Sequence, residues 1–435
     1  MNFGGFNSCN CHGSLYMKEK ILNNLYNPEG LESLYRKDPE TFAASFVKIP
    51  PETVQQIKAT WIARFNADGL YSSNNEKYKI ETNISLPILI LLILTAGTLV
   101  KLPDLTGISE TYFYPRYLGF ALFLILSAYF MILNGFRKAV WIPVSILMLV
   151  SAIYAGLLPT PEQSQTALIA LLHLPFLLWF FMGFFFVNGD IKTVDKRDTF
   201  LEFNGEWIVY TALLAFAGMI LTGITAGLFS LVDEALFETL IPWIAPYGVA
   251  LCLIGGAHLV FLRRNNTAPV APVIARIFSP LFLLTLLVYL SIVFLKGMNL
   301  FMDRNTLMVF NAMLLLILAM AIFSIRENEI FKNSKYQDFI LTALLSLGLL
   351  LDLTALSAIL FRLGSYGLSP NRIAVLGLNL LIAGHVTGLL LDIIGKIQGK
   401  KGLHHLRNRT GRYLTVYAGW TAFMVFIYPL FFRFQ

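Results

Sequence analysis

Long apolar segments dominate this sequence, and they decide what the chain can fold into. A helix that crosses a bilayer needs about 20 mostly apolar residues, and segments of this kind occur at residues 84–100, 117–134, 139–158, 167–187, 208–232, 244–262, 277–295, 306–325, 339–361, 373–394 and 413–432. Lipid offers no partners to backbone N–H and C=O groups, so spans must be helices or strands of a closed barrel. The alternating pattern of barrel strands is absent. We therefore predict an all-α polytopic bundle of about eleven spans, with ten or twelve as alternatives.

Composition and charge point to a lipid environment. The chain is 56% hydrophobic and 14% charged, whereas soluble proteins carry about 25% charged residues. A net charge of +7 could suit nucleic acid in a soluble protein. Here the basic residues fall mostly in short segments between the apolar runs, so we expect a lipid bilayer as partner and no nucleic acid. Anionic lipids are expected at the basic cytoplasmic loops, such as residues 395–412.

The distribution of basic residues also predicts an orientation. When the segments between the eleven spans are assigned alternately to two sides, 26 of the 33 Lys and Arg residues fall on one side. The positive-inside rule places that side, and with it the N-terminus, in the cytoplasm. The C-terminus is then extracytoplasmic. A wrong span count midway along the chain would have scrambled this alternation.

The residues before the first span form the only sizeable polar region. We expect a disordered extension over residues 1–16, a cytoplasmic helical region with a tether over 17–83, and the membrane bundle over 84–435. Asn27-Pro28 and Asp38-Pro39 each provide a cap residue followed by proline, which is typical of helix starts. A third helix is predicted from Pro51, with an apolar face of Val54, Ile57, Trp61 and Phe65. That face would pack on the other helices, the membrane surface or a cytoplasmic protein partner.

Two ionisable residues near the middle of neighbouring spans form a candidate intramembrane site. Asp352 lies in the ninth predicted span and His385 in the tenth, at depths that differ by roughly 4.5 Å. Such groups are costly in lipid, and they suggest either function or a hydrogen bond that joins two helices. We predict that they face the interior and interact directly or through one water. For His173 and His258, in other spans, we favour the helix-joining role.

The loop between these two spans carries a second group of candidate residues: Arg362, Tyr366, Gly367, Ser369 and Arg372. Ser369 can cap the tenth span, with Pro370 at its first position. Arg372 then lies in the first turn, where the helix dipole disfavours a cation. We expect compensation by an acid such as Glu110 or by a lipid phosphate, unless the arginines simply extend to the interface.

The segment Tyr366–Arg372 reads Tyr-Gly-Leu-Ser-Pro-Asn-Arg. It resembles the Tyr-Gly-Leu-Thr-x-x-Arg motif of a bacterial multi-pass membrane family known as domain of unknown function 4153, with Ser369 in place of the usual threonine. The closing span, with Trp420 and the run Tyr428–Leu430, is also similar to that family. The resemblance covers residues 84–435. It implies a protein of the bacterial inner membrane, and it implies no reaction, substrate or catalytic residue.

These observations leave two leading functional hypotheses. The first is a permease-like or ion-coupled transporter that uses Asp352 and His385. The second is a non-enzymatic scaffold or sensor that binds a cytoplasmic partner through residues 17–83. A membrane enzyme ranks behind both, because neither a cluster of carboxylates and histidines on an outer loop nor a nucleotide-binding loop is present. Neither the run Cys9–His12 nor the pair His404-His405 has enough ligands for a metal site, so we expect no metal and no cofactor.

Overall fold

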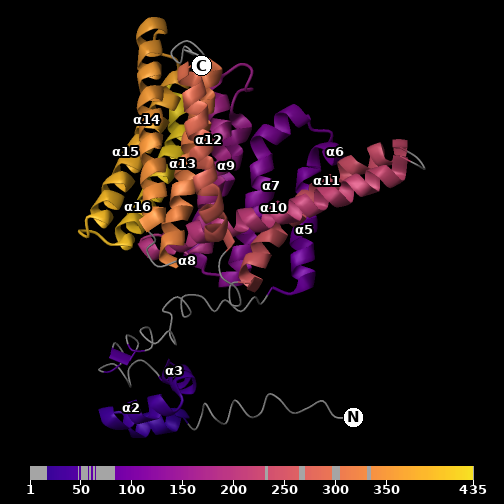
Figure 1. The fold of residues 1–435 in the computed structure, drawn as a ribbon. Coiled ribbons are helices and arrows are strands. Elements are labelled where there is room, and N and C mark those ends of the chain that lie inside the picture. The colour runs from indigo at the N-terminus through magenta and orange to yellow at the C-terminus, as the bar shows by residue number, and fades with distance from the viewer. Residues whose placement is uncertain are drawn as a thin grey trace. The chain divides into compact units, whose positions relative to one another are not determined.

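The computed structural model describes residues 17–47, 49, 57, 60–61, 64, 84–230, 234–263, 270–295, 304–330 and 335–434. Every regular element in these ranges is a helix (Figure 1). The chain divides into two compact units, Met1–Glu81 and Thr82–Gln435. The extension over residues 1–16 and most of the tether before residue 84 lie outside the described residues.

The N-terminal unit contains a helical segment over residues 17–23 and the helices α2 (Pro28–Lys37) and α3 (Pro39–Val47). Both predicted caps are confirmed: the Asn27 side chain accepts a hydrogen bond from the Gly30 N–H at 3.1 Å, and Asp38 accepts one from the Thr41 N–H at 3.0 Å. These helices enclose a core of buried apolar side chains: Ile21, Leu31, Tyr35, Phe42, Phe46 and Trp61, with Ile57 packed against it. The predicted Val54 and Phe65 lie outside the described residues.

The second unit contains the apolar helices. They are α5 (Leu86–Val100), the short α6 (Leu102–Thr106), α7 (Glu110–Asn134), α8 (Lys138–Leu157), α9 (Gln165–Phe186), α10 (Val194–Ser230), α11 (Glu234–Arg263), α12 (Val270–Leu295), α13 (Arg304–Ile330), α14 (Lys335–Tyr366), α15 (Pro370–Ile397) and α16 (Leu403–Ala422). One π-helical turn, η1 (Phe423–Ile427), connects α16 to α17 (Tyr428–Phe431).

Nine helical segments within the described ranges are long and apolar enough to cross a membrane, so this is a multi-pass membrane protein. The count is nearer nine than the eleven predicted. The difference arises at two places. Helix α5 has 15 residues, which gives it a length of about 22 Å, short of a hydrocarbon core about 30 Å thick. Helix α12 contributes the shorter apolar stretch Arg276–Ile292.

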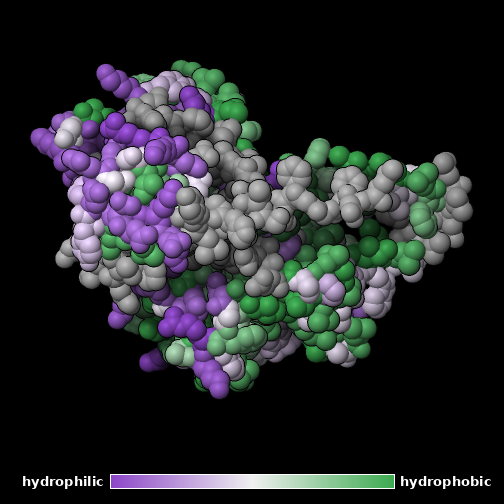
Figure 2. All heavy atoms as spheres, turned by 90° about the horizontal axis from the view of Figure 1, so that it is seen from below, coloured by the Kyte–Doolittle hydropathy of each residue, from purple (hydrophilic) through white to green (hydrophobic). Residues whose placement is uncertain are grey.

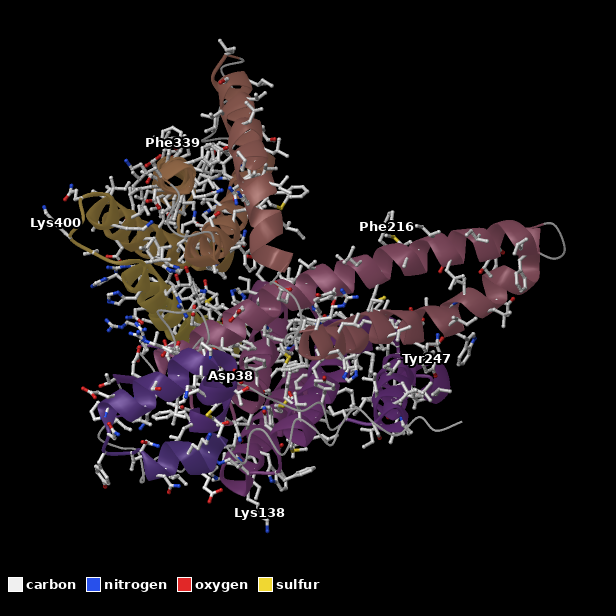
Figure 3. The ribbon with its side chains drawn as sticks, turned by 60° about the horizontal axis from the view of Figure 1, so that its bottom comes forward. Asp38, Lys138, Phe216, Tyr247, Phe339 and Lys400 are labelled. Carbon is white, nitrogen blue, oxygen red and sulfur yellow. The ribbon has the colours of Figure 1, made fainter. Side chains whose placement is uncertain are left out.

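Two groups of helices make up most of this unit. In one, α13, α14, α15 and α16 pack around a shared apolar core that includes Leu341, Leu345, Val386 and Leu389. In the other, α10 and α11 form a long antiparallel hairpin, and α5 packs against α11 (Figures 1 and 3). A Cβ atom at Gly97 would lie 2.2 Å from the Tyr247 ring, so glycine permits this contact between α5 and α11.

The C-terminal half of α10 carries apolar side chains that are exposed on the surface of this unit. Phe216, labelled in Figure 3, is 61% exposed, and Leu221 is 66% exposed. A Cβ atom at Gly223 would meet no described atom within 4 Å. Figure 2 shows hydrophobic side chains over the side of the molecule where α5, α10 and α11 lie. In a membrane protein such a surface contacts lipid.

Candidate functional site

The two candidate intramembrane residues lie in the interior of the α13–α16 group. Asp352, on α14, is 0% exposed, and His385, on α15, is 1% exposed. Helix α14 packs along α15, and α15 packs along α16. Residues one and two turns from Asp352, at Ala355 and Ile359, are also buried, so this face of α14 points into the bundle over its length.

Two tyrosines of α16 hold the His385 ring. Its Nδ1 lies 3.1 Å from the Tyr417 hydroxyl, and which of the two donates depends on the tautomer. The ring stacks on Tyr413, with centroids 4.1 Å apart and planes 5° from parallel. Neither tyrosine was predicted from the sequence. The available signal was their spacing of four residues, which puts them on one face of a helix.

Asp352 lies beside this cluster without a hydrogen bond to it. Neither carboxylate oxygen of Asp352 has a hydrogen-bond partner among the described atoms, and the same holds for Nε2 of His385. The predicted direct hydrogen bond between Asp352 and His385 is therefore not seen, and an interaction through one water stays a prediction. Of these two residues, His385 is the one that contacts the Tyr417 hydroxyl.

The other two intramembrane histidines have simple structural partners. Nδ1 of His173 lies 2.8 Å from the Ile169 carbonyl, one turn earlier in α9. Nδ1 of His258 lies 3.1 Å from the Tyr129 hydroxyl and joins α11 to α7. These contacts fit the role of satisfying polar groups within and between helices.

Two glycines bring α16 close to α15 beside His385. A Cβ atom at Gly384 would lie 2.9 Å from the Tyr413 hydroxyl, and one at Gly388 would lie 2.5 Å from Nη1 of Arg409. The absence of a side chain at these two positions therefore permits a close approach of α16 to α15. It also brings the Arg409 guanidinium to the same side of α15 as His385.

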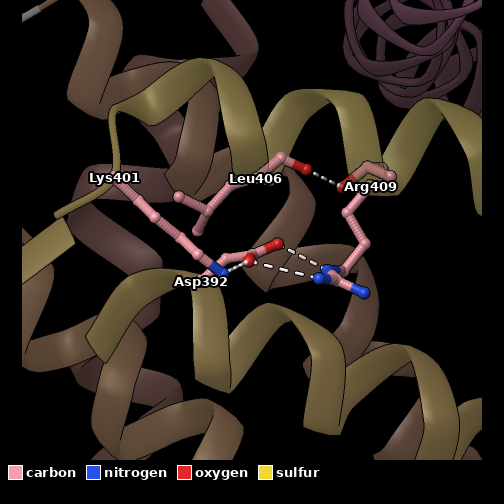
Figure 4. A network of polar contacts seen from close by, with 5 residues as sticks. Asp392, Lys401, Leu406 and Arg409 are labelled. Atoms are coloured by element: carbon pink, nitrogen blue, oxygen red, sulfur yellow. Dashed lines mark hydrogen bonds and ion pairs between the residues drawn. The ribbon is translucent and has the colours of Figure 1, made fainter. Parts of the chain in front are cut away.

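One turn beyond Gly388, the buried carboxylate of Asp392 binds two cations. Lys401 Nζ donates to it at 2.6 Å, and Arg409 donates through Nε at 2.5 Å and through Nη2 at 3.2 Å (Figure 4). The Asp392 side chain is 3% exposed, whereas Lys401 and Arg409 are about one-third exposed, at 35% and 33%. Asp392 was not predicted from the sequence, because an acid near the end of a span has the pattern of an ordinary interfacial residue.

Further ion pairs lie at the same end of the bundle. Lys396, on α15, donates to Asp338 of α14 at 2.6 Å, and Arg407, on α16, binds Asp198 of α10. We call this set of acids with their cations the acid-paired end. Four basic residues of the segment 395–412, expected to attract anionic lipid, thus bind acidic side chains of the protein itself.

The predicted loop motif forms a closed turn at the opposite end of α14 and α15. Gly367 has φ +73°, a left-handed conformation that glycine adopts easily. The Ser369 hydroxyl caps α15 by accepting from the Arg372 N–H at 3.4 Å. Nη1 of Arg372 donates to the Tyr366 and Gly367 carbonyls, at 2.9 and 2.6 Å, and its guanidinium lies 5.5 Å from the Tyr366 ring centroid.

This turn explains how Arg372 is tolerated in the first turn of α15. Its guanidinium reaches back to the last carbonyls of α14, where a helix dipole favours a cation. These carbonyls compensate part of its charge, and the expected compensation by Glu110 or by a lipid phosphate stays a prediction. Arg362 differs from Arg372 in its hydrogen bonding. Its Nε is buried and has no hydrogen-bond partner among the described atoms.

A cavity of about 540 Å³ adjoins this turn, between α9, α13, α14 and α15. Arg362, Ser369 and Arg372 line it, together with the polar residues Gln165, Asn311 and Asn371. At its inner side, Asn311 accepts a hydrogen bond from the buried Asn379 at 3.0 Å. The cavity volume lies in the range of small-molecule sites.

In the described part of the chain, no three His, Cys, Asp or Glu side chains lie around a common point. Cys9 and Cys11 lie outside the described residues. The rings of His404 and His405 contact each other.

No protein-family model, curated protein or solved structure matches this chain. The resemblance of the segment Tyr366–Arg372 to a bacterial membrane family stays a prediction. The geometry of the turn gives that motif a physical reason: each of Tyr366, Gly367, Ser369 and Arg372 takes part in closing it.

Proposed function

We propose that this protein is a permease-like membrane protein that moves protons or ions along the polar residues between α14, α15 and α16. The observation that carries this proposal is Asp352: its carboxylate is buried, and no described atom forms a hydrogen bond with it. A carboxylate that serves only to join two helices would be expected to bind a donor on the second helix. An unpartnered one can exchange a proton or bind a cation.

A series of polar residues on α15 and α16 supports a route from His385 to the acid-paired end. The Tyr417 hydroxyl contacts His385. The His385 ring stacks on Tyr413. Gly388 then admits Arg409, which binds Asp392.

We also propose that the N-terminus is cytoplasmic. Polar contacts between helices join ends that the charge distribution assigns to the same side. At the cytoplasmic end, for example, Ser279 of α12 contacts Ser324 of α13 at 2.9 Å. At the outer end, Lys101, just after α5, lies 4.6 Å from the Trp243 ring of α11. Both contacts are consistent with the sides that the charge distribution assigns. The resemblance to the bacterial family favours the inner membrane as the compartment.

Proton flux into liposomes tests the transport proposal. Purified protein is reconstituted with a pH-sensitive dye inside the vesicles, and a pH step or a potential is applied. Wild-type protein should accelerate the internal pH change, and Asp352→Asn should abolish the acceleration. Glu162→Gln, which also replaces an acid by its amide but at an exposed position, should keep it. Equal flux with Asp352→Asn and wild-type protein would overturn the proposal.

The scaffold or sensor hypothesis keeps support from one observation. The N-terminal unit has its own hydrophobic core around Tyr35, Phe42 and Trp61, and it clusters separately from the bundle. Such a unit is able to bind a cytoplasmic protein without help from the membrane helices.

This alternative makes a distinct prediction. Full-length protein in detergent should capture a specific cytoplasmic protein, and Trp61→Ala, which removes a side chain of that core, should abolish capture while leaving proton flux unchanged. Loss of flux in Asp352→Asn together with unchanged capture would assign transport to the bundle and partner binding to the N-terminal unit. Capture that survives disruption of this core would reject the scaffold role for the unit.

A further inference from the structure

We propose that the cavity between α9, α13, α14 and α15 binds a phosphate group, supplied either by a phospholipid headgroup or by a soluble phosphate ester. The cavity lies at the outer ends of these helices in the proposed topology. It is separate from Asp352, and the binding proposed here stands whether or not the protein moves protons.

The charges around the cavity favour an anion. Two of its twelve lining residues are the arginines Arg362 and Arg372, and none is acidic. The cavity also contacts the first turn of α15 through Ser369 and Asn371, where the helix dipole and unpaired N–H groups favour negative charge. Arginine presents a planar fork of N–H donors that matches the oxygens of phosphate.

The two arginines differ in how many of their donors already have partners, and we infer different roles for them. Arg372 uses Nη1 to hold the Tyr366 and Gly367 carbonyls, so it is fixed in place with other donors left for a ligand. Arg362 has a buried Nε with no described partner. A buried donor without a partner is costly, and an oxygen of a bound phosphate would satisfy it. Arg362 is therefore the main ligand-binding residue of this site.

The rest of the lining indicates a ligand with both polar and apolar parts. Half of the lining residues are apolar, among them Leu168, Met308 and Val375. The remaining polar ones, such as Gln165 and Asn311, can hydrogen-bond the uncharged part of a headgroup. A volume of about 540 Å³ accommodates a headgroup and the start of an acyl chain, or a small phosphate ester.

Binding is tested with full-length protein in two arms. In the first, retention of phosphatidylglycerol through delipidation is measured by native mass spectrometry. In the second, binding of glycerol phosphate to delipidated protein is measured by calorimetry. Arg362→Gln should weaken the binding seen in either arm at least tenfold, as expected for the loss of charge-assisted hydrogen bonds. Retention in the first arm identifies lipid as the source, and heat in the second identifies a soluble ester.

Two further variants keep the test decisive. Arg433→Gln removes a basic residue that is exposed and does not line the cavity, so it should bind as wild-type protein does. Val375→Trp keeps both arginines but fills the cavity from α15, and it should weaken binding as Arg362→Gln does. The proposal is overturned if neither probe binds wild-type protein, or if Arg362→Gln and Arg433→Gln have equal effects.

Discussion

The two ends of the α13–α16 group treat basic side chains in different ways. At the acid-paired end, Lys396, Lys401, Arg407 and Arg409 bind carboxylates on three different helices. At the other end, Arg372 donates to backbone carbonyls. Arg116, in α7 outside this group, also binds carbonyls and is 2% exposed. It donates to the carbonyls of Tyr112, Ala155, Leu158 and Pro159, at 3.0 to 3.2 Å.

This difference follows from where the acids lie. Asp392 and Asp338 are carried by the same helices as Arg372 and Arg362, but at the opposite ends. Without acids nearby, an arginine can be satisfied by carbonyls at a helix C-terminus, which carry partial negative charge. Salt bridges join separate helices by charge. The carbonyl-bound arginines instead depend on the positions of backbone carbonyls, within one turn at Arg372 and between α7 and the end of α8 at Arg116. The two ends should therefore respond differently to substitution and to salt.

Replacing Asp392 should have the largest effect on stability. Asp392→Asn leaves Lys401 and Arg409 facing each other without a counter-charge. Removal of one partner of a buried ion pair costs about 3–5 kcal/mol. Because both cations are one-third exposed, water screens part of this, and we expect a loss of about 2–3 kcal/mol. Thermal unfolding in detergent measures it, with Glu162→Gln as the control. Equal unfolding temperatures for these two variants would show that the ion pairs contribute nothing.

Replacing Arg116 should have the next largest effect, with a different dependence on salt. Arg116→Met removes donors from buried carbonyls, and we expect a loss of about 2 kcal/mol. Raising the salt concentration should shrink the effect of Asp392→Asn, because partly exposed charges are screened. It should leave the effect of Arg116→Met nearly unchanged. If both effects fall equally, the proposed distinction between the two ends is wrong.

The helices could be predicted from the sequence more accurately than the contacts between their side chains. Apolar run length and cap residues depend on neighbours along the chain, so the all-α class and the caps at Asn27 and Asp38 could be read directly. The predicted span count of eleven was too high, in part because α5 has only 15 residues. A short apolar run does not reveal whether its neighbours let it cross.

The candidate site shows why side-chain partners are harder to predict. Asp352 and His385 stood out because ionisable groups are rare in apolar helices. Tyr417, which contacts His385, did not, because tyrosine is common in such helices. Arg372 was expected to need an acid or lipid, yet it binds carbonyls six and five residues away. Carbonyls are present at every residue, so sequence alone cannot show which ones are unpaired and within reach.

A smaller effect tests how α15 and α16 approach each other at the acid-paired end. In Gly388→Ala the added methyl would lie 2.5 Å from Nη1 and 2.7 Å from Cδ of Arg409. Arg409 must move, which weakens its contact with Asp392, and we expect a loss of about 1 kcal/mol. Gly419→Ala is the matched control, because a Cβ there meets nothing within 4 Å. The control should be neutral or slightly stabilising. Equal stabilisation of both variants would exclude the close approach.

The smallest expected effect is at the turn between α14 and α15, where geometry rather than charge holds the chain. Ser369→Ala removes the oxygen that accepts from the Arg372 N–H, and loss of a cap costs about 1 kcal/mol. Ser369→Thr keeps that oxygen and should differ from wild-type protein by less than about 0.5 kcal/mol. Both variants leave the Arg372 guanidinium and its carbonyl partners in place, so neither should change the response to salt. Unfolding temperatures at low and high salt measure both quantities. A threonine variant as unstable as the alanine variant would show that the hydroxyl does not cap α15, and the physical reason given for the motif would then fail.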